Sequence, residues 1–297
     1  MPCCFRRRFL LLSIVAVACV VTVRAAEGDA AVSQIAAPKR VGPEFAFVCL
    51  ADSKVPKLEE LQAKLASWLQ LPSAGEIKDL KSTAVDKKTV ITFTASGRPF
   101  TLSLVGEPIP KADIDYACDN ALAWPEAAVE MARQRAQLLV LASGDYPNPA
   151  EKALAVSQAA AAVSECFDTV GIYWSQASIA HSPAAFREEI KESDATREKL
   201  PVALWVGFLI ARGKTGGMDV YTRGLESFGA MEVEILDSKK KTEDVFNLLN
   251  AAAGYLIDQG NVIKDGDTVG LTPTENVPSH YAESAIGRPG KVLRLDY

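Results

Sequence analysis

Three acidic side chains in the last third of the chain have the type and spacing that acid–base chemistry needs. Glu232 and Glu234 stand two residues apart in an alternating segment, and Glu226 precedes them. Side chains two apart on a strand point to one face, so this pair could line a cleft as general acid and base. The same alternation is typical of the solvent-facing side of a sheet, and we expect both glutamates to lie there.

Two glycine-containing segments are similar to ligand motifs but depart from them. The Gly-Lys-Thr segment at residues 213–215 lacks the spacing of a phosphate loop, because Gly207 stands one residue too early. The spacing of Asp265 and Asp267 is that of the first two ligands in a calcium-binding loop. However, Val269 occupies the third ligand position and the bidentate glutamate is missing. We therefore expect a hairpin turn and a solvated turn, with no nucleotide, other cofactor or metal ion.

A polar patch at these turns is the candidate binding site, with the members Arg223, Glu226, Asp265 and Asp267. Gly224, Gly229 and Gly266 are predicted to adopt positive φ at the turns, which leaves the charged neighbours at the surface. The two histidines, His181 and His280, have no catalytic partner that adjacency can identify, and no catalytic residue is assigned. The larger aromatic side chains are expected in the core or at its rim, or else around a ligand groove: Trp124, Tyr173, Trp174 and Trp205.

The elements that carry these acids follow one another closely. Residues 231–236 alternate apolar and acidic side chains, which predicts a half-buried strand. Thr242 is predicted to cap a helix that ends at Gly260. Asp-Gly within residues 262–269 then predicts a hairpin. The helix has an apolar stripe at helical spacing, made of Val245, Leu248, Leu249, Ala252 and Leu256.

Residues 222–229 read TxGLExFG, residues 232–234 ExE and residues 265–270 DGDTxG. On these motifs the chain, from about residue 201 to its end, resembles a C-terminal domain of bacterial proteins that is known only as a domain of unknown function. That family has no established activity. The resemblance therefore implies a domain and no particular chemistry.

The earlier part of the chain has the order strand, helix, strand, strand, helix, strand, which is the split βαβ arrangement of ferredoxin-like folds. The predicted elements are strand 45–50, helix 58–69, hairpin strands 89–95 and 100–105, helix 124–135 and strand 137–142. A helix capped by Asn148, a strand at 169–174 and a helix from Ser182 follow, then a charged junction at 191–199 and a long strand at 202–211. We predict an α+β fold, with a ferredoxin-like half at 44–180 packed against a second α+β half at 181–297.

Residues 1–25 are predicted to be a signal peptide, followed by a disordered lead-in at 26–43. Arg6, Arg7 and Arg8 precede an apolar run that ends in a small-residue cleavage site after Ala25. The run is short for a membrane span, which needs about 20 apolar residues. The expected destination is the periplasm or the outside of the cell. A retained anchor and a lipoprotein modified at Cys19 are the alternatives.

Cleavage would remove four of the 32 basic residues, so 28 would face 37 acidic ones and the formal charge would be −9. An acidic chain without a basic stripe argues against a nucleic-acid partner. Three cysteines would remain, Cys49, Cys118 and Cys166, without a Cys-x-x-Cys pair. One disulfide with one thiol, or three reduced thiols, both fit this set.

These observations favour a non-enzymatic exported binding or protein-interaction protein, with a protein or small molecule as its partner and no membrane span in the mature chain. A cell-envelope hydrolase that uses Glu226, Glu232 or Asp265 is the alternative. A homodimer formed through an exposed sheet edge is a third possibility.

Overall fold

The computed structural model describes residues 22–24, 45–86, 88–193 and 200–297. Within these residues the chain forms two seven-stranded sheets and seven α-helices, so the predicted α+β class is confirmed. The predicted signal peptide up to residue 21, Cys19, the lead-in and residues 194–199 of the charged junction lie outside the described residues. No helix in the described ranges is both long and apolar enough to cross a membrane.

The first sheet is antiparallel throughout. Its strands lie in the order β3 (Lys78–Val85), β4 (Lys88–Ala95), β5 (Arg98–Val105), β6 (Ala136–Ala142), β2 (Phe45–Leu50), β7 (Thr169–Trp174) and β8 (Ile179–His181). Strands β5, β6, β2 and β7 are adjacent, and α1 (Leu58–Trp68) and α4 (Pro149–Cys166) lie in their connections. The ferredoxin-like assignment stays a prediction, because β3, β4 and β8 extend the sheet at its two edges.

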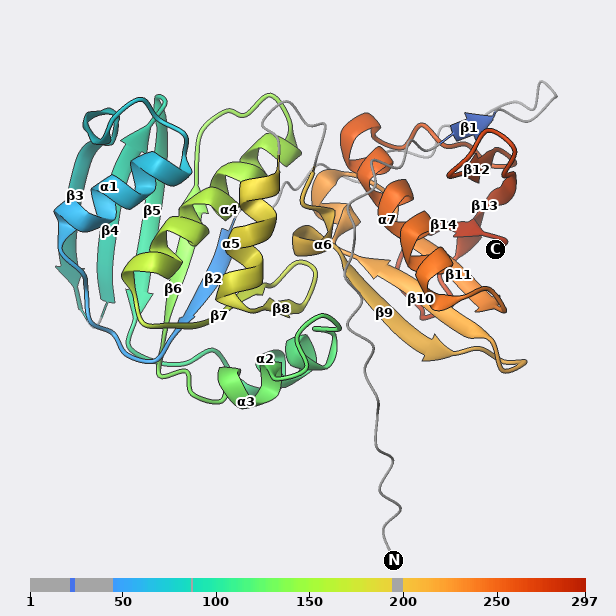
Figure 1. The fold of residues 1–297 in the computed structure, drawn as a ribbon, viewed down its shortest axis with the longest axis horizontal. Coiled ribbons are helices and arrows are strands. Elements are labelled where there is room, and N and C mark those ends of the chain that lie inside the picture. The colour runs from blue at the N-terminus through green and yellow to red at the C-terminus, as the bar shows by residue number, and fades with distance from the viewer. Residues whose placement is uncertain (1–21, 25–44, 87, 194–199) are drawn as a thin grey trace, which may run out of the picture.

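Helices cover both faces of this sheet (Figure 1). On one side lie α1, α4 and α5 (Pro183–Glu192), and on the other lie α2 (Lys111–Asp119) and α3 (Ala127–Met131). Strand β2 alternates between the two: Ala46 and Val48 join the main core, while Cys49 joins a second cluster with residues of α2 and α3. A strand buried on both faces explains the continuous apolar sequence of residues 45–50.

Local signals placed several helix ends correctly. The Asn148 side chain accepts the Glu151 N–H at 3.0 Å and donates to its carboxylate at 2.9 Å, which confirms the predicted Asn148 cap. Ser182 likewise caps α5 by accepting the Ala185 N–H. The Thr242 cap is wrong: Thr242 is the first residue of α7 (Thr242–Gln259), and the Lys241 side chain before it makes no capping bond.

The second sheet has the strand order β1 (Thr22–Arg24), β12 (Thr268–Gly270), β13 (Val277–Glu283), β14 (Lys291–Leu295), β11 (Val233–Ser238), β10 (Met218–Arg223) and β9 (Gly207–Arg212). Only β11 and β14 pair in parallel. Helix α7 buries its entire predicted apolar stripe, together with Val233 and Ile235 of β11. The face of β11 that packs on α7 is therefore the apolar face of the predicted alternation.

Other expectations from the sequence are wrong. Residues 202–211 form a short helix, α6 (Val202–Trp205), before β9, because a short apolar run does not distinguish helix from strand. The predicted hairpin at residues 262–269 is absent from this described region, where β12 pairs with β1 and β13. The helix expected at 124–135 is only α3, and neither α2 nor the mostly exposed strand β3 was expected.

The two halves share one continuous core. The Trp205 indole N–H donates to Ser157 Oγ in α4 at 2.9 Å, and the Trp205 ring lies 5.5 Å from that of Phe228. Phe228 belongs to the 3₁₀ turn η2 (Leu225–Phe228); a second such turn, η1 (Ala74–Glu76), follows α1. The domain boundary after residue 180 stays a prediction. Strand β8 runs across it, and α5 packs against α4.

Strand β1 would be lost if the leader were cleaved after Ala25. Val23 pairs with Val269 and packs against the core, while Arg24 donates to Asn276 Oδ1 and to the Pro273 carbonyl. We expect a chain that begins at Ala26 to be less stable than one that begins at Thr22 by about 1 kcal/mol, since Val23 is only partly buried. Urea unfolding of both chains measures this difference, and equal midpoints would show that β12 does not need β1.

Candidate binding site

The two glutamates at β11 are buried, so the prediction that they lie on a solvent-facing strand surface is wrong. Glu232 is 4% exposed and Glu234 is 0% exposed. Glu232 Oε2 accepts the Thr222 hydroxyl at 2.6 Å, and its Oε1 accepts the Gly224 N–H at 2.7 Å. Arg288 Nη1 lies 3.9 Å from Oε2. Burial raises the pKa of Glu232, and these hydrogen bonds and the Arg288 charge offset part of that rise.

Glu234 binds the loop between β13 and β14. Its Oε1 accepts the Ser284 hydroxyl at 2.6 Å, and its Oε2 accepts the Ala285 N–H at 3.0 Å and Arg294 Nη2 at 2.7 Å. All four carboxylate oxygens of the pair Glu232 and Glu234 are thus occupied by donors from the protein. The two acids of the ExE motif therefore hold the turn at Gly224 and the β13–β14 loop against the sheet. Their oxygens are occupied by protein donors and are not free to act on a substrate.

The structure divides the predicted polar patch into two separate groups. Arg223 and Glu226 lie at the end of β10 and in η2, whereas Asp265 and Asp267 precede β12. Three strands lie between β12 and β10 in the sheet, a distance of about 19 Å at about 4.8 Å per strand. The four side chains do not form one site.

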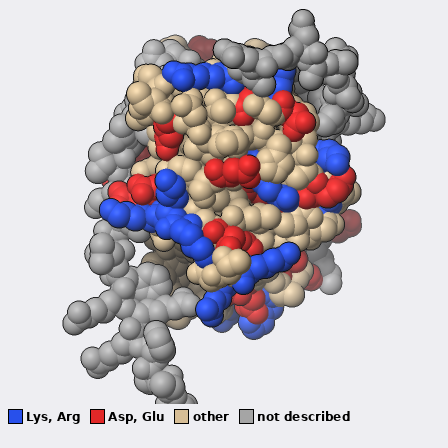
Figure 2. Space-filling model, turned by 90° about the vertical axis from the view of Figure 1, so that its right-hand side faces the viewer, with Lys and Arg blue, Asp and Glu red and all other residues tan. Residues whose placement is uncertain are grey.

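Three members of the patch are accessible, and one is buried. Arg223 Nη1 donates to Tyr116 of α2 at 3.3 Å, and Glu226 and Asp265 are exposed. Asp267 is only 4% exposed and accepts the Lys264 N–H at 2.8 Å, so its description as a surface acid is wrong. Gly224, Gly229 and Gly266 all have positive φ, as predicted. Figure 2 shows acidic and basic side chains interspersed over the C-terminal end of the molecule, without a large area of one sign.

The Gly-Lys-Thr segment forms the predicted hairpin turn between β9 and β10. The Gly213 N–H donates to the Gly217 carbonyl at 2.9 Å, which closes the turn. The Asp237 carboxylate accepts the Thr215 hydroxyl and the Gly217 N–H, and these bonds lower its pKa to about 2. The amides of this turn therefore hold a side chain of the protein itself.

Cys49 is buried, whereas Cys118, Cys166 and Trp124 are half-buried, and Cys118 and Trp124 pack against the second cluster. All three described cysteines are free thiols, and burial raises the pKa of Cys118 and Cys166 to about 11. Trp174 and Trp205 are fully buried and Tyr173 nearly so, so they line no groove. In the described parts of the chain, no three His, Cys, Asp or Glu side chains gather closely enough to hold a metal ion.

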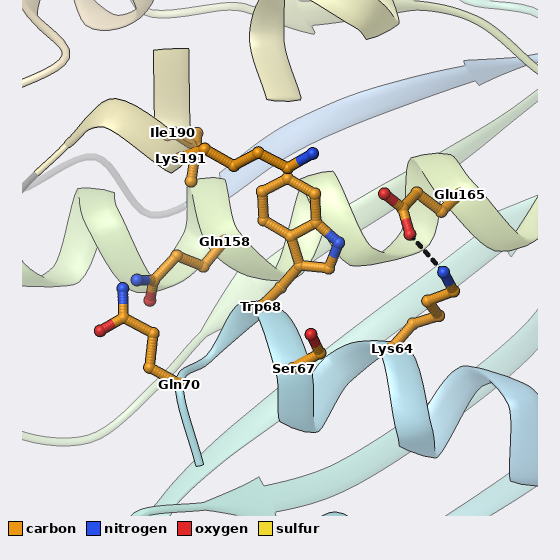
Figure 3. A pocket seen from close by; sticks show the side chains of 8 residues that line it. All are labelled: Lys64, Ser67, Trp68, Gln70, Gln158, Glu165, Ile190 and Lys191. Atoms are coloured by element: carbon orange, nitrogen blue, oxygen red, sulfur yellow. Dashed lines mark ion pairs between the residues drawn. The ribbon is translucent and has the colours of Figure 1, made fainter. Parts of the chain in front are cut away.

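A pocket of about 380 Å³ lies on the other half of the protein, between α1, α4 and α5 (Figure 3). We call it the α1–α4–α5 pocket. Its lining residues are Lys64, Ser67 and Trp68 of α1, Gln70 just after it, Gln158 and Glu165 of α4, and Ile190 and Lys191 of α5. A volume near the lower end of the range of about 300–1,000 Å³ suits a small ligand.

Charges in the pocket are partly compensated. Lys64 Nζ lies 2.7 Å from Glu165 Oε2. Burial alone would raise the pKa of Glu165, but the hydrogen bond and charge of Lys64 outweigh it and the pKa is lowered. The Lys191 ammonium lies 5.3 Å from the centroid of the Trp68 ring, a cation–π arrangement. Lys191 has no carboxylate within ion-pair distance among the described residues, so no described carboxylate compensates its charge.

Two amides face the cavity from opposite walls (Figure 3). The Gln158 side chain is 9% exposed, and within the described structure its amide has no hydrogen-bond partner. Gln70 has φ 54°, in the left-handed region at the end of α1 where glycine is usual. A ligand with matching donor and acceptor groups would give these amides partners that the protein does not supply.

Sequence reasoning missed this pocket. Its residues come from three separate helices, and the first of them was predicted only as a helix at residues 58–69. The one local signal is Gln70, which stands after α1 where a glycine is expected.

Comparison with known proteins places a family match in the other half of the chain. Residues 221–296 match a family described as a domain of unknown function (DUF4261), which confirms the resemblance of the C-terminal region to such a family. No curated protein and no solved structure matches the chain. The molecule is thus an α+β protein whose matched region holds the buried glutamates, while the α1–α4–α5 pocket lies outside it.

Replacing Glu234 by Ala should destabilise the protein strongly. The change leaves the partly buried Arg294 without its carboxylate and the Ala285 N–H without its acceptor. Breaking a buried ion pair in this way costs about 3–5 kcal/mol. Chemical denaturation measures the loss, with the exposed Glu226→Gln as a control expected within about 0.5 kcal/mol of wild type. A Glu234→Ala protein as stable as the control would contradict the structural role of Glu234 in holding the β13–β14 loop.

Acid should destabilise the protein through His181. Burial lowers its pKa to about 4, and the hydrogen bond from Nε2 to the Leu204 carbonyl at 3.1 Å offsets part of the effect. The unfolded chain therefore takes up this proton more readily, so the contribution is complete above about pH 6.5 and is lost as the pH falls toward 4. At about 1.4 kcal/mol per pKa unit the loss is about 3 kcal/mol. The difference in unfolding free energy between wild type and His181→Gln should shrink by that amount between pH 7 and pH 4, and a constant difference would refute the assignment.

Proposed function

We propose that this protein is an exported, non-enzymatic binding protein that holds a small molecule in the α1–α4–α5 pocket. The observation that carries the proposal is the Gln158 amide, which belongs to a residue that is only 9% exposed, faces the cavity and has no protein hydrogen-bond partner within the described structure. A ligand in the cavity would supply the partner that no described protein group provides. The basic, apolar and small-residue pattern of residues 1–25 supports export.

The arrangement of the acids argues against the alternative of a hydrolase. Glu232 and Glu234 bind protein donors with both oxygens, and Glu226 and Asp265 lie on opposite sides of three intervening strands. Acid–base hydrolysis needs two groups that converge on one bond. In contrast, an aromatic wall, two amides and an unpaired ammonium converge on the pocket.

Equilibrium dialysis against a small-molecule extract of bacterial cell envelopes tests the proposal. Mass spectrometry should detect at least one compound that wild-type protein retains and that Gln158→Leu protein does not. Leucine fills a similar volume on α4 without the amide, and Asp265→Asn serves as a control that should retain the compound. The retained compound should also remain chemically unchanged.

Two results would overturn the proposal. Equal retention by wild type and Gln158→Leu would remove the pocket from the function. Consumption of a compound by wild type but not by Glu226→Gln or Asp265→Asn would instead establish the hydrolase.

A further inference from the structure

We propose that the α1–α4–α5 pocket recognises a small monocarboxylate that also carries an amide group, as N-acylated amino acids do. This inference rests on the proposed binding function and assigns the class of ligand.

The charge of the ligand follows from the ion pairs of the lining. Lys64 is neutralised by Glu165 at 2.7 Å, so the lining has one uncompensated charge, the Lys191 ammonium. One ammonium matches one carboxylate. A phosphate dianion would need a second free cation, and the Glu165 carboxylate at the wall would repel it.

The amide of the ligand follows from the two glutamines. Gln70 and Gln158 each present an N–H donor and a carbonyl acceptor, and they extend toward each other across the cavity (Figure 3). A secondary amide has the same two functions and can donate to one glutamine while it accepts from the other. Gln158 as a residue is 9% exposed, and its amide has no protein partner within the described structure, so a ligand amide can take the place of water there.

The walls limit the rest of the ligand. Trp68 and Ile190 are 9% and 3% exposed, and they form apolar surfaces on the α1 and α5 sides. In Figure 3 the Trp68 ring lies between the two glutamine amides and the ion pair of Lys64 and Glu165, with Lys191 next to it. A carboxylate at Lys191 and an amide at the glutamines therefore leave room near Trp68 for a small apolar side chain.

Backbone geometry at Gln70 supports a ligand role for that residue. Its φ of 54° is a conformation in which a side chain is strained and glycine is not. Replacing Gln70 by Gly should raise the melting temperature and at the same time weaken ligand binding. If Gln70 had a purely structural role, its replacement by Gly would raise the melting temperature without weakening ligand binding.

The test uses N-acetyl-L-alanine as the probe. Its neutral amide analogue lacks the carboxylate, propionate lacks the amide, and inorganic phosphate replaces both. Dissociation constants come from titrations followed by the NMR signals of the Trp68 indole and the glutamine side-chain amides. N-acetyl-L-alanine should bind at least tenfold more tightly than each of the other three compounds.

Four variants separate the contacts. Lys191→Met should abolish the tenfold preference over the neutral analogue, while Lys191→Arg should keep it. Lys57→Met removes the same charge from the residue that precedes α1, at the far end of that helix from Trp68, and should change nothing. Gln158→Leu should weaken N-acetyl-L-alanine to the level of propionate.

Equal binding of N-acetyl-L-alanine and its neutral analogue would overturn the carboxylate assignment, and tighter phosphate binding would replace it with an anion site. If the dialysis experiment still finds a compound whose retention depends on Gln158, the binding function stands and only the ligand class is wrong. If neither the probes nor the extract bind, both proposals fail.

Discussion

The carboxylate of Glu232 is the interaction on which the connection between the two halves depends. It accepts the Gly224 N–H and so fixes the turn after β10. Gly224 lies so close to the Trp205 backbone that a Cβ atom would stand 2.5 Å from its carbonyl oxygen, and φ there is 119°. Trp205 in turn donates to Ser157 of α4. A buried acid in the second sheet is thus linked, through one glycine and one tryptophan, to the central helix of the first half.

This linkage gives the two halves different roles. In the C-terminal sheet, buried acids and arginines hold the β13–β14 loop and the turn at Gly224 against the strands. In the N-terminal half, three helices cover one face of the sheet. They leave between them a cavity lined by the Gln70 and Gln158 amides. The buried acids lie in the region that matches the family of unknown function, at residues 221–296, and the pocket lies outside that region. A ligand in the pocket would contact α4, the same helix that receives the Trp205 hydrogen bond.

Elements whose formation depends on residues close together in the sequence were predictable. The Asn148 cap, the apolar stripe of α7 and the hairpin of β4 and β5 each depend on residues within a few positions of one another. The apolar run at 202–211 was not predictable, since a continuous apolar run has no period that separates a helix from a strand. Strand β3 was missed for the opposite reason: it is an exposed edge strand, and its pairing with β4 depends on backbone bonds that need no particular side chains.

The sequence by itself determined the α+β class, most of the helices and strands, and the need for positive φ at Gly224, Gly229 and Gly266, because these depend on local propensity and periodicity. Only the tertiary structure decided where the acids lie. Glu234 is buried because Arg294, 60 residues later, pairs with it from the neighbouring strand, whereas the same alternating pattern on an open sheet face would leave it in solvent. The α1–α4–α5 pocket likewise exists only through the packing of three helices. The spacing of residues within one helix cannot predict a cavity that this helix forms together with two others.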